Sequence, residues 1–229
     1  MVRNIRIETA PTATAATTAA RLLVRFSGLA SVGEPLLVIL IDEATAAAER
    51  LTGRPLARAT YRELLSGNGT EILRLGRAPL ESVTSVAVAG SALDSTAYGR
   101  VDTLQPNLRR LSGTSGFYEA WPLCRRASGF VESQAVAGLD AQLNIEVVYT
   151  AGYWLPSMSG SAPAGAHVLP IGLESAVQRL LVDLLDEEQR GSGVASIKKG
   201  DREIRYVEGV GPISSWVADA LEREAVVYS

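Results

Sequence analysis

The stretch NIEVVYTAGYWLP, from Asn144 to Pro156, decides how this chain is organised. Its first half alternates apolar and polar side chains, which predicts a half-buried strand from Leu143 to Thr150. The alternation stops at Gly152, a residue that permits backbone angles which other residues resist. Because a proline cannot continue the hydrogen-bonded ladder, the strand is expected to end and the chain to change direction here.

Three aromatic residues surround this turn. We expect their rings to be buried and their polar tips to reach water, as is common for tyrosine and tryptophan. The turn is therefore interpreted as a junction between a β-domain and a helical body, formed by Tyr149, Gly152, Tyr153 and Trp154. This interpretation gives the four residues an architectural role and no part in chemistry.

Turn residues interrupt an apolar period of two at short intervals between residues 56 and 157. This spacing is typical of an antiparallel β-domain made of short strands. Besides the strand of the opening stretch, the expected strands are Ala57–Leu64, Thr70–Leu75, Val83–Val88, Ala97–Thr103 and Phe117–Leu123.

A helical period precedes the β-domain. Pro35 suits a first helical position and Gly53 suits a stop, so the wide apolar stripe between them, which begins at Leu36, predicts a helix from Glu34 to Leu51. A shorter helix is expected before it, from Thr17 to Phe26.

The helical period returns after Pro170. The apolar residues of this helix form one face, and its polar residues are expected to face solvent or another subunit. These polar residues are Glu174, Gln178, Asp183 and the run Asp186 to Glu188. A hairpin that turns at Lys199–Asp201 is predicted from Ala195 to Val207. An amphipathic helix that Pro212 opens and that includes Ile213 is expected to follow it.

These elements predict an α+β fold, with a small bundle of N- and C-terminal helices, an inserted antiparallel β-domain, and a C-terminal hairpin plus helix. The N-terminal residues are rich in threonine and alanine apart from a possible strand at Arg3–Glu8, so they are expected to form an arm. The expected regions are an arm at 1–16, a helical body at 17–55 and 167–229, a β-domain at 56–157, and a linker at 158–166.

Composition argues against several classes of protein. The 229 residues carry a net charge of −3, which is unlike the basic footprint of a general nucleic-acid binder. The longest aliphatic run, Leu36 to Ile41, is far shorter than a membrane helix, so no membrane association is expected. No apolar signal region follows Arg3 and Arg6, which favours synthesis in the cytoplasm without export. A single cysteine excludes an internal disulfide framework.

Reactive side chains are few. Nucleophilic chemistry would need Cys124 together with His167, the only histidine, and nothing in the sequence brings the two together. One cysteine and one histidine do not supply the four N or S ligands of a structural zinc site. The glycine-rich turns at 67–69 and 191–193 lack the Lys-Ser/Thr pair of a phosphate loop. We therefore expect no catalytic residue, no cofactor and no metal.

The C-terminal segment holds the candidate protein–protein interface. An isolated hairpin is marginally stable in water, so another surface is expected to pack against it. The hairpin also carries the one local basic patch, and an aromatic and aliphatic cluster follows it. The candidate interface residues are Ile197, Lys198, Lys199, Arg202, Ile204, Arg205, Tyr206, Trp216, Val217 and Leu221.

Several fragments, taken in order and with their spacing, resemble a known family. They are ERLTGR (49–54), PLESVTSV (79–86), VAG (88–90), LRR (108–110), EVVYTAGY (146–153) and LP (169–170), together with Leu36, Ala44, Tyr98, Trp121 and Ala176. Over roughly residues 34–185, this pattern resembles the head-tail connector proteins of tailed bacteriophages, also called adaptor or head-completion proteins, with relatives in prophages and gene transfer agents. The chain differs from the family pattern by a larger β-insertion, Gly90 to Leu143, and by the N-terminal arm.

The resemblance implies a non-enzymatic structural protein of the virion neck. Members of the family form a ring, typically of twelve copies, beneath the portal of the DNA-filled head. The ring continues the DNA channel without sequence-specific binding. It docks the portal protein on one side and a tail-side stopper or tail-terminator protein on the other. The resemblance therefore implies that the chain is made in the cytoplasm of a bacterial host and resides in the particle.

Two alternatives from other classes stay open. One is a cryptic hydrolase that uses Cys124 and His167. The other is a free-standing β-module that binds a ligand or a nucleic acid. Turnover of a substrate would favour the first alternative, whereas loss of assembly on removal of the helices would favour the neck protein.

Overall fold

A computed structural model describes residues 3–102, 105–111, 118–122, 144–190, 196–199, 202–207, 211–214 and 217–222. The chain divides into two compact units, which we call the β-unit and the helical unit. The β-unit comprises Met1–Pro11 and Arg58–Gly152, and the helical unit comprises Thr12–Ala57 and Tyr153–Ser229. Helices and antiparallel sheets both occur, which confirms the α+β class.

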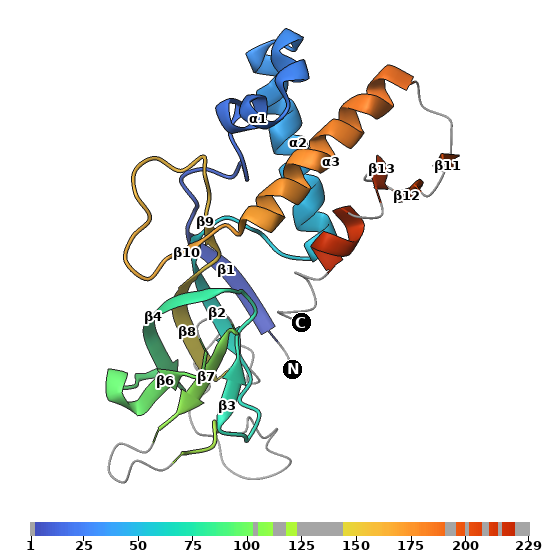
Figure 1. Cartoon of the computed structure of the whole chain (residues 1–229). Helices are drawn as coiled ribbons and strands as arrows, with labels where there is room; N and C mark the ends of the chain where they lie inside the picture. Colours follow the sequence, from blue (N-terminus) through green and yellow to red (C-terminus); the bar gives the residue numbers. More distant parts are fainter. Residues whose placement is uncertain are drawn as a thin grey trace. The chain divides into compact units, whose positions relative to one another are not determined.

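The main sheet of the β-unit has five strands in the order β1-β2-β8-β4-β5, and every neighbouring pair is antiparallel (Figure 1). The predicted strand of the opening stretch is confirmed as β8, which lies at the centre of this sheet. Alternate residues of β2 and β8 are buried, as the period of two predicts. The strand bounds are β1 (Arg3–Thr9), β2 (Ala59–Leu65), β4 (Leu80–Val88), β5 (Ser91–Ala92) and β8 (Ile145–Ala151).

A second sheet of three strands has the order β3-β7-β6. Its strands are β3 (Ile72–Arg74), β6 (Tyr98–Arg100) and β7 (Asn107–Arg110), and the short 3-10 helix η2 (Ser95–Ala97) precedes β6. The two sheets share one apolar core, since Leu73 and Leu108 of the second sheet cluster with Tyr61, Val147 and Tyr149 of the first.

Three details of the β-unit differ from the sequence prediction. The two-residue strand β5 was not predicted, because its residues lie within a run of turn residues. Strand β7 was not predicted, because its single buried apolar residue, Leu108, lies between polar neighbours and shows no alternation that sequence can detect. The strand predicted at Phe117–Leu123 is wrong over its described part. Between residues 118 and 122, only Tyr118 forms a bridge, to Leu111, and Trp121 is a buried core residue outside any strand.

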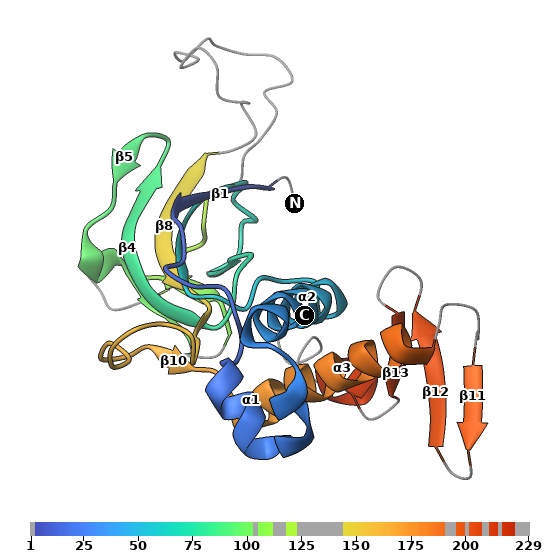
Figure 2. The same ribbon diagram turned by 90° about the horizontal axis from the view of Figure 1, so that it is seen from above.

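The helical unit contains α1 (Ala19–Arg25), the 3-10 helix η1 (Ser27–Ser31), α2 (Glu34–Thr52) and α3 (Ile171–Arg190). The helices predicted at Thr17–Phe26, at Glu34–Leu51 and after Pro170 are confirmed, and α2 and α3 lie against each other, as Figures 1 and 2 show. Pro35 lies in the first turn of α2, and Gly53 ends the helix with a left-handed φ of 68°. None of the described helices is both long enough and apolar enough to cross a membrane.

After β8, the chain enters the helical unit through the short strand β9 (Tyr153–Trp154), which pairs in parallel with β10 (His167–Val168). Residues 155–166 between them contain no helix or strand, which confirms the predicted loop at 158–166. Met158 of this loop is nevertheless buried and belongs to the core of the helical unit.

The predicted C-terminal hairpin is confirmed as β11 (Ser196–Lys199) and β12 (Arg202–Val207). A third strand, β13 (Gly211–Ser214), extends it, so Pro212 and Ile213 lie in a strand and do not open the last helix as predicted. Proline is compatible with this position because β13 lies at the edge of the three-stranded sheet. The described helical residues of the last helix are 217–222.

Residues 3–16, expected as a free arm, are folded onto the two units. Residues 3–9 form the edge strand β1, and the backbone N–H of Ala16 donates to Thr45 Oγ1 at 3.1 Å. Ala16 and Thr17 are buried within the helical unit. Small alanine and threonine side chains allow this close packing. The composition had predicted an arm because these residues offer little hydrophobic surface.

Candidate functional site

The described residues do not assemble an obvious chemical centre. Cys124 lies outside them, so its expected distance from His167 stays untested. His167 is half-buried in β10 and lies opposite Tyr153 in the parallel ladder. Within the described parts of the chain, no group of three His, Cys, Asp or Glu side chains could hold a metal ion.

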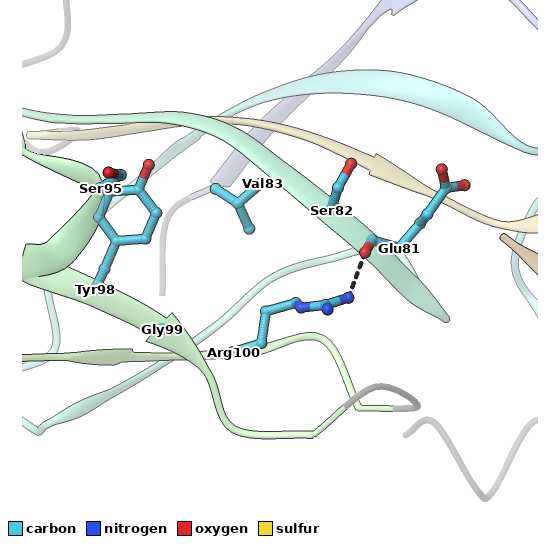
Figure 3. A pocket seen from close by; sticks show the side chains of 7 residues that line it. All are labelled: Glu81, Ser82, Val83, Ser95, Tyr98, Gly99 and Arg100. Atoms are coloured by element: carbon cyan, nitrogen blue, oxygen red, sulfur yellow. Dashed lines mark hydrogen bonds between the residues drawn. The ribbon is translucent and has the colours of Figure 1, made fainter. Parts of the chain in front are cut away.

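The β-unit has an open pocket of about 310 Å³ between β4 and the segment that contains η2 and β6 (Figure 3). Its lining residues are Glu81, Ser82, Val83, Ser95, Tyr98, Gly99 and Arg100. The Arg100 guanidinium reaches across the pocket and donates to the backbone carbonyl of Glu81. The Glu81 carboxylate is held by two hydrogen bonds from Arg58, at 2.5 and 2.7 Å.

These contacts fix the charged groups of the pocket within the protein. The Glu81 carboxylate accepts two hydrogen bonds from Arg58, and the Arg100 guanidinium is held by the backbone carbonyl oxygen of Glu81. The hydrogen bond to Glu81 raises the pKa of Arg58, so the Arg58 guanidinium stays charged at every physiological pH.

A buried carboxylate ties together several segments of the β-unit. Glu63 on β2 is fully buried and accepts from the Tyr149 hydroxyl at 2.6 Å and from the Gly76 N–H at 2.9 Å. Arg3 on β1 pairs with it at 2.8 Å, between Nε and Oε1. Burial, followed by the negative charge of Glu63, raises the pKa of Tyr149 far above its ordinary value. The cluster links β1, β2, β8 and the turn at Gly76, so it stabilises the sheet.

The expected junction lies where the chain passes from one unit to the other. Gly152 is the last residue of the β-unit and has a φ of 102°, a left-handed value that glycine adopts more readily than other residues. Tyr153 is the first residue of the helical unit, where it is buried and lies under the Arg54 guanidinium, 5.7 Å from the ring centre. Trp154 packs against the same core.

One expectation for the junction is wrong. The tip of Tyr149 does not reach water, because the side chain is fully buried and its hydroxyl donates to Glu63. A buried carboxylate on the neighbouring strand replaces the expected water as the partner of the hydroxyl. Sequence could not identify this partner, because the pairing of β2 with β8 brings residues 63 and 149 together across 86 positions.

The structure describes only some of the residues that were predicted to form the C-terminal interface. The backbone of β11 and β12 forms the predicted hairpin, but the side chains of Ile197, Lys198, Lys199, Arg202, Ile204, Arg205, Tyr206 and Trp216 lie outside the described residues. Val217 and Leu221 are fully buried in the core of the helical unit. These two residues therefore pack within their own chain and are removed from the candidate interface.

A buried polar network fastens the N-terminal segment to α3. The Thr17 hydroxyl donates to Glu174 and accepts from the Gln178 side chain, both at 2.9 Å. Arg21 of α1 pairs with Glu174 at 3.1 Å, and Arg25 donates to Gln178 at 3.2 Å. The expectation that Glu174 and Gln178 face solvent or another subunit is therefore wrong, because Thr17 and α1 cover them.

Large apolar side chains are exposed on the helices of the helical unit. On α2, Leu36, Val38 and Ile39 are 45%, 48% and 55% exposed, although Leu36 was predicted to be part of the buried stripe. On α1, Val24 is 88% exposed. Contiguous exposed apolar side chains mark interaction surfaces more often than chemical sites. The signal in the sequence was an apolar run, residues 36–41, that covers more of α2 than one buried face needs.

Comparison with known proteins gives a fold relationship. No family model matches the chain, and no curated protein matches it in sequence. Among solved structures, it is similar to a chain from the neck of a native GTA particle computed with C12 symmetry, with 18% identity and a TM-score of 0.53. It is also similar to a chain from the neck of an empty GTA particle computed with C6 symmetry, with 20% identity and a TM-score of 0.56. Each likeness covers 96% of this chain and 94% of the other, so the two folds correspond almost end to end.

Proposed function

We propose that this chain is a structural neck protein of a tailed-phage-like particle, a head-tail connector that assembles as a ring of twelve copies. The observation that supports the proposal best is the fold, which is shared over 96% of this chain with chains from particle necks. Those necks were computed with C12 and C6 symmetry, and both symmetries place identical chains around one axis. The fragments that resemble connector proteins support the same role from the sequence alone.

In this role, the ring lies beneath the portal and extends the DNA channel towards the tail. The portal protein docks on one side, and a tail-side stopper or tail-terminator protein docks on the other. DNA passes through without sequence-specific binding, which agrees with the net charge of −3. The mature location is the neck of the particle.

We assign the three-stranded C-terminal sheet to contacts with these neighbouring proteins. Its first two strands carry Lys198, Lys199, Arg202 and Arg205, which form a basic group at the hairpin. A basic group suits an acidic surface of the portal or the phosphates of passing DNA, and salt is expected to weaken either contact.

A structural role requires no reaction of the chain itself. The two charged side chains of the described pocket, Glu81 and Arg100, are held by protein partners, and the buried Glu63–Tyr149 pair is closed off from substrates by the sheet. The hydrolase alternative would depend on Cys124 and His167, and we propose that neither takes part in the function.

Electron microscopy of particles that contain this chain tests the proposal. We expect density for a ring of identical copies between head and tail, with rotational symmetry and with this fold fitting each copy. A chain found in one or two copies per particle, or found outside the neck, would contradict the proposal. Particles from which the chain has been deleted should contain DNA-filled heads that fail to join tails.

A further inference from the structure

Helix α1 presents an apolar side chain beside two cations. Val24 is 88% exposed, and both Arg21, three residues before it, and Arg25, next to it, lie on the exposed part of the helix. Arg21 already pairs with Glu174, yet 54% of its side chain stays exposed. A guanidinium carries five N–H donors, so Arg21 can bind a second carboxylate without losing the first.

Helix α2 presents the opposite combination. Ile39 is 55% exposed in the second turn of the helix, and the helical period places the exposed acids Asp42 and Glu43 on either side of it, one turn further along. Neither acid has an ion-pair partner within the described residues. The first cation of this helix is Arg50, which is about 16 Å from Ile39 along the axis at 1.5 Å per residue.

The charges of the two helices are segregated along the sequence. Residues 9–33, which include α1, contain Arg21 and Arg25 and no acidic residue. Residues 34–49, which make up most of α2, contain four acidic residues and no basic one. The cations of α1 bond to Glu174 and Gln178 of α3, so the outer acids of α2 stay available for another molecule.

We propose that α1 of one copy docks against α2 of the next copy in a head-to-tail contact, with Val24 packed beside Ile39. The two arginines of α1 then face the two acids on the outer face of α2. A contact between two different surfaces of the same chain repeats around a ring when its rotation closes. The inference rests on the proposed ring and names the surfaces that join its subunits.

The exposed apolar residues of the helical unit outside α1 and α2 do not share this charge pattern. Val168 and Ile171 are 61% and 78% exposed, but residues 160–173 contain no Asp, Glu, Lys or Arg. They therefore lack the complementary charges that would select a second copy of this chain. Val168 supplies a matched control, because a substitution there changes an equally exposed apolar residue outside the proposed contact.

Cysteine pairing tests the contact directly, in a Cys124→Ser background. Mixing a Val24→Cys chain with an Ile39→Cys chain should give a cross-linked pair on mild oxidation or with a short bis-maleimide. A chain with both substitutions should give a ladder that ends at the closed ring. Each single variant alone should stay uncross-linked, because a head-to-tail contact does not place a residue opposite its own copy. Efficient homodimers of either single variant would overturn the inference.

Association measurements provide the second test. Ile39→Asp should weaken self-association by roughly 30-fold, as expected for a central apolar contact, and Asp42→Lys with Glu43→Lys by about tenfold. The Val168→Asp control should associate like the unmodified chain. If the chain forms a symmetric ring that none of these variants disturbs and that yields no cross-link between positions 24 and 39, the contact is wrong and the neck role stands. If the chain stays monomeric at the highest soluble concentration and is absent from particle necks, both proposals fail.

Discussion

Tyr149 and Glu63 show how a single pair of side chains makes the β-unit sensitive to alkali. The Tyr149 hydroxyl donates to a carboxylate that is fully buried, at 2.6 Å. Both burial and the charge of Glu63 oppose loss of the tyrosine proton, so the pKa of Tyr149 is raised in the folded state. In the unfolded chain, the same hydroxyl ionises near its ordinary pKa of about 10.

The sign of the resulting pH dependence follows from this difference. A raised pKa means that the folded state holds the proton more tightly, so its contribution to stability is complete below about pH 10 and is lost as pH rises further. We expect the free energy of unfolding to fall by up to about 1.4 kcal/mol per pH unit above pH 10 on account of Tyr149. Tyr149→Phe should cost about 1 kcal/mol at neutral pH and should show a shallower alkaline decline.

Urea unfolding followed by tryptophan fluorescence between pH 8 and pH 11 measures this effect. Tyr98→Phe is the matched control, because Tyr98 is only partly buried and has no hydroxyl contact within the described residues. The control should keep the alkaline decline of the unmodified chain. Parallel declines for Tyr149→Phe and the unmodified chain would show that the buried pair does not set the pH response.

The backbone conformation of Gly152 is a second case in which a single residue is expected to affect stability. Its φ of 102° is a value that residues with a Cβ rarely adopt, so Gly152→Ala should reduce stability by about 1–3 kcal/mol. Gly172 in α3 is the control: a Cβ added there meets no atom within 4 Å, and alanine favours helix. Thermal unfolding should therefore show a lower Tm for Gly152→Ala and an unchanged or slightly higher Tm for Gly172→Ala. Equal Tm values for the two variants would contradict the strained junction.

Elements are joined by polar contacts that the helical period does not reveal. The N-terminal segment and α1 are held to α3 by Thr17, Glu174 and Gln178, all of which are buried. Thr17→Val removes a donor and an acceptor at once, so Glu174 and Gln178 each lose one of their buried hydrogen bonds. We expect a loss of about 1–3 kcal/mol and faster amide exchange across residues 12–25.

Hydrogen exchange measured by mass spectrometry resolves that effect within the chain. Thr14→Val is a matched control because Thr14 is exposed in the same segment. It should leave the exchange of residues 12–25 unchanged. If Thr17→Val accelerated exchange equally in the β-unit and the helical unit, the network would not act locally on α1.

Assembly provides two predictions for the complete chain. The first concerns the basic hairpin: replacing Lys198, Lys199, Arg202 and Arg205 with glutamine should leave the fold intact and weaken attachment to neighbouring neck proteins. Attachment of the unmodified chain should fall with added salt, whereas the variant should show a smaller salt dependence. The fraction of chain retained on particles at increasing salt measures both. An unchanged salt response would remove the hairpin from the contact.

The second concerns the hydrolase alternative. Cys124→Ser and His167→Ala should each leave particle assembly and infectivity or transfer unchanged, because we assign neither residue to the function. Particle yield and electron microscopy of the necks check this result. A variant that folds and assembles normally but yields inactive particles would restore a chemical role for that residue.

Val217 and Leu221 are buried, so removing the C-terminal segment is a poor test of its contacts with other proteins. A truncation after Arg190 removes two residues from the core of the helical unit along with the three-stranded sheet. Such a deletion would lower stability through lost packing as well as through lost contacts with other proteins. Substitution of exposed residues therefore separates docking from folding better than truncation does.

Periodicity along the sequence was sufficient for the elements whose causes are local. The alternation before Gly152 predicted β8, Pro35 and Gly53 marked the first turn and the end of α2, and the turn at Lys199–Asp201 predicted the hairpin of β11 and β12. Each of these signals lies within a few residues of the structure it specifies. The resemblance to head-tail connectors likewise needed only the order of short fragments.

Only the tertiary structure decided which polar residues are buried and which apolar ones are exposed. The helical period predicted that Glu174 and Gln178 of α3 face solvent or another subunit. In the structure, both form hydrogen bonds with Thr17, which lies more than 150 positions earlier in the sequence. Leu36 looked like a core residue of α2, yet 45% of it is exposed. Strand β7 and the Glu63–Tyr149 pair depend in the same way on partners distant in sequence. A residue's environment depends on what the rest of the chain packs against it. Contacts between residues distant in sequence produce no periodic pattern from which they could be predicted.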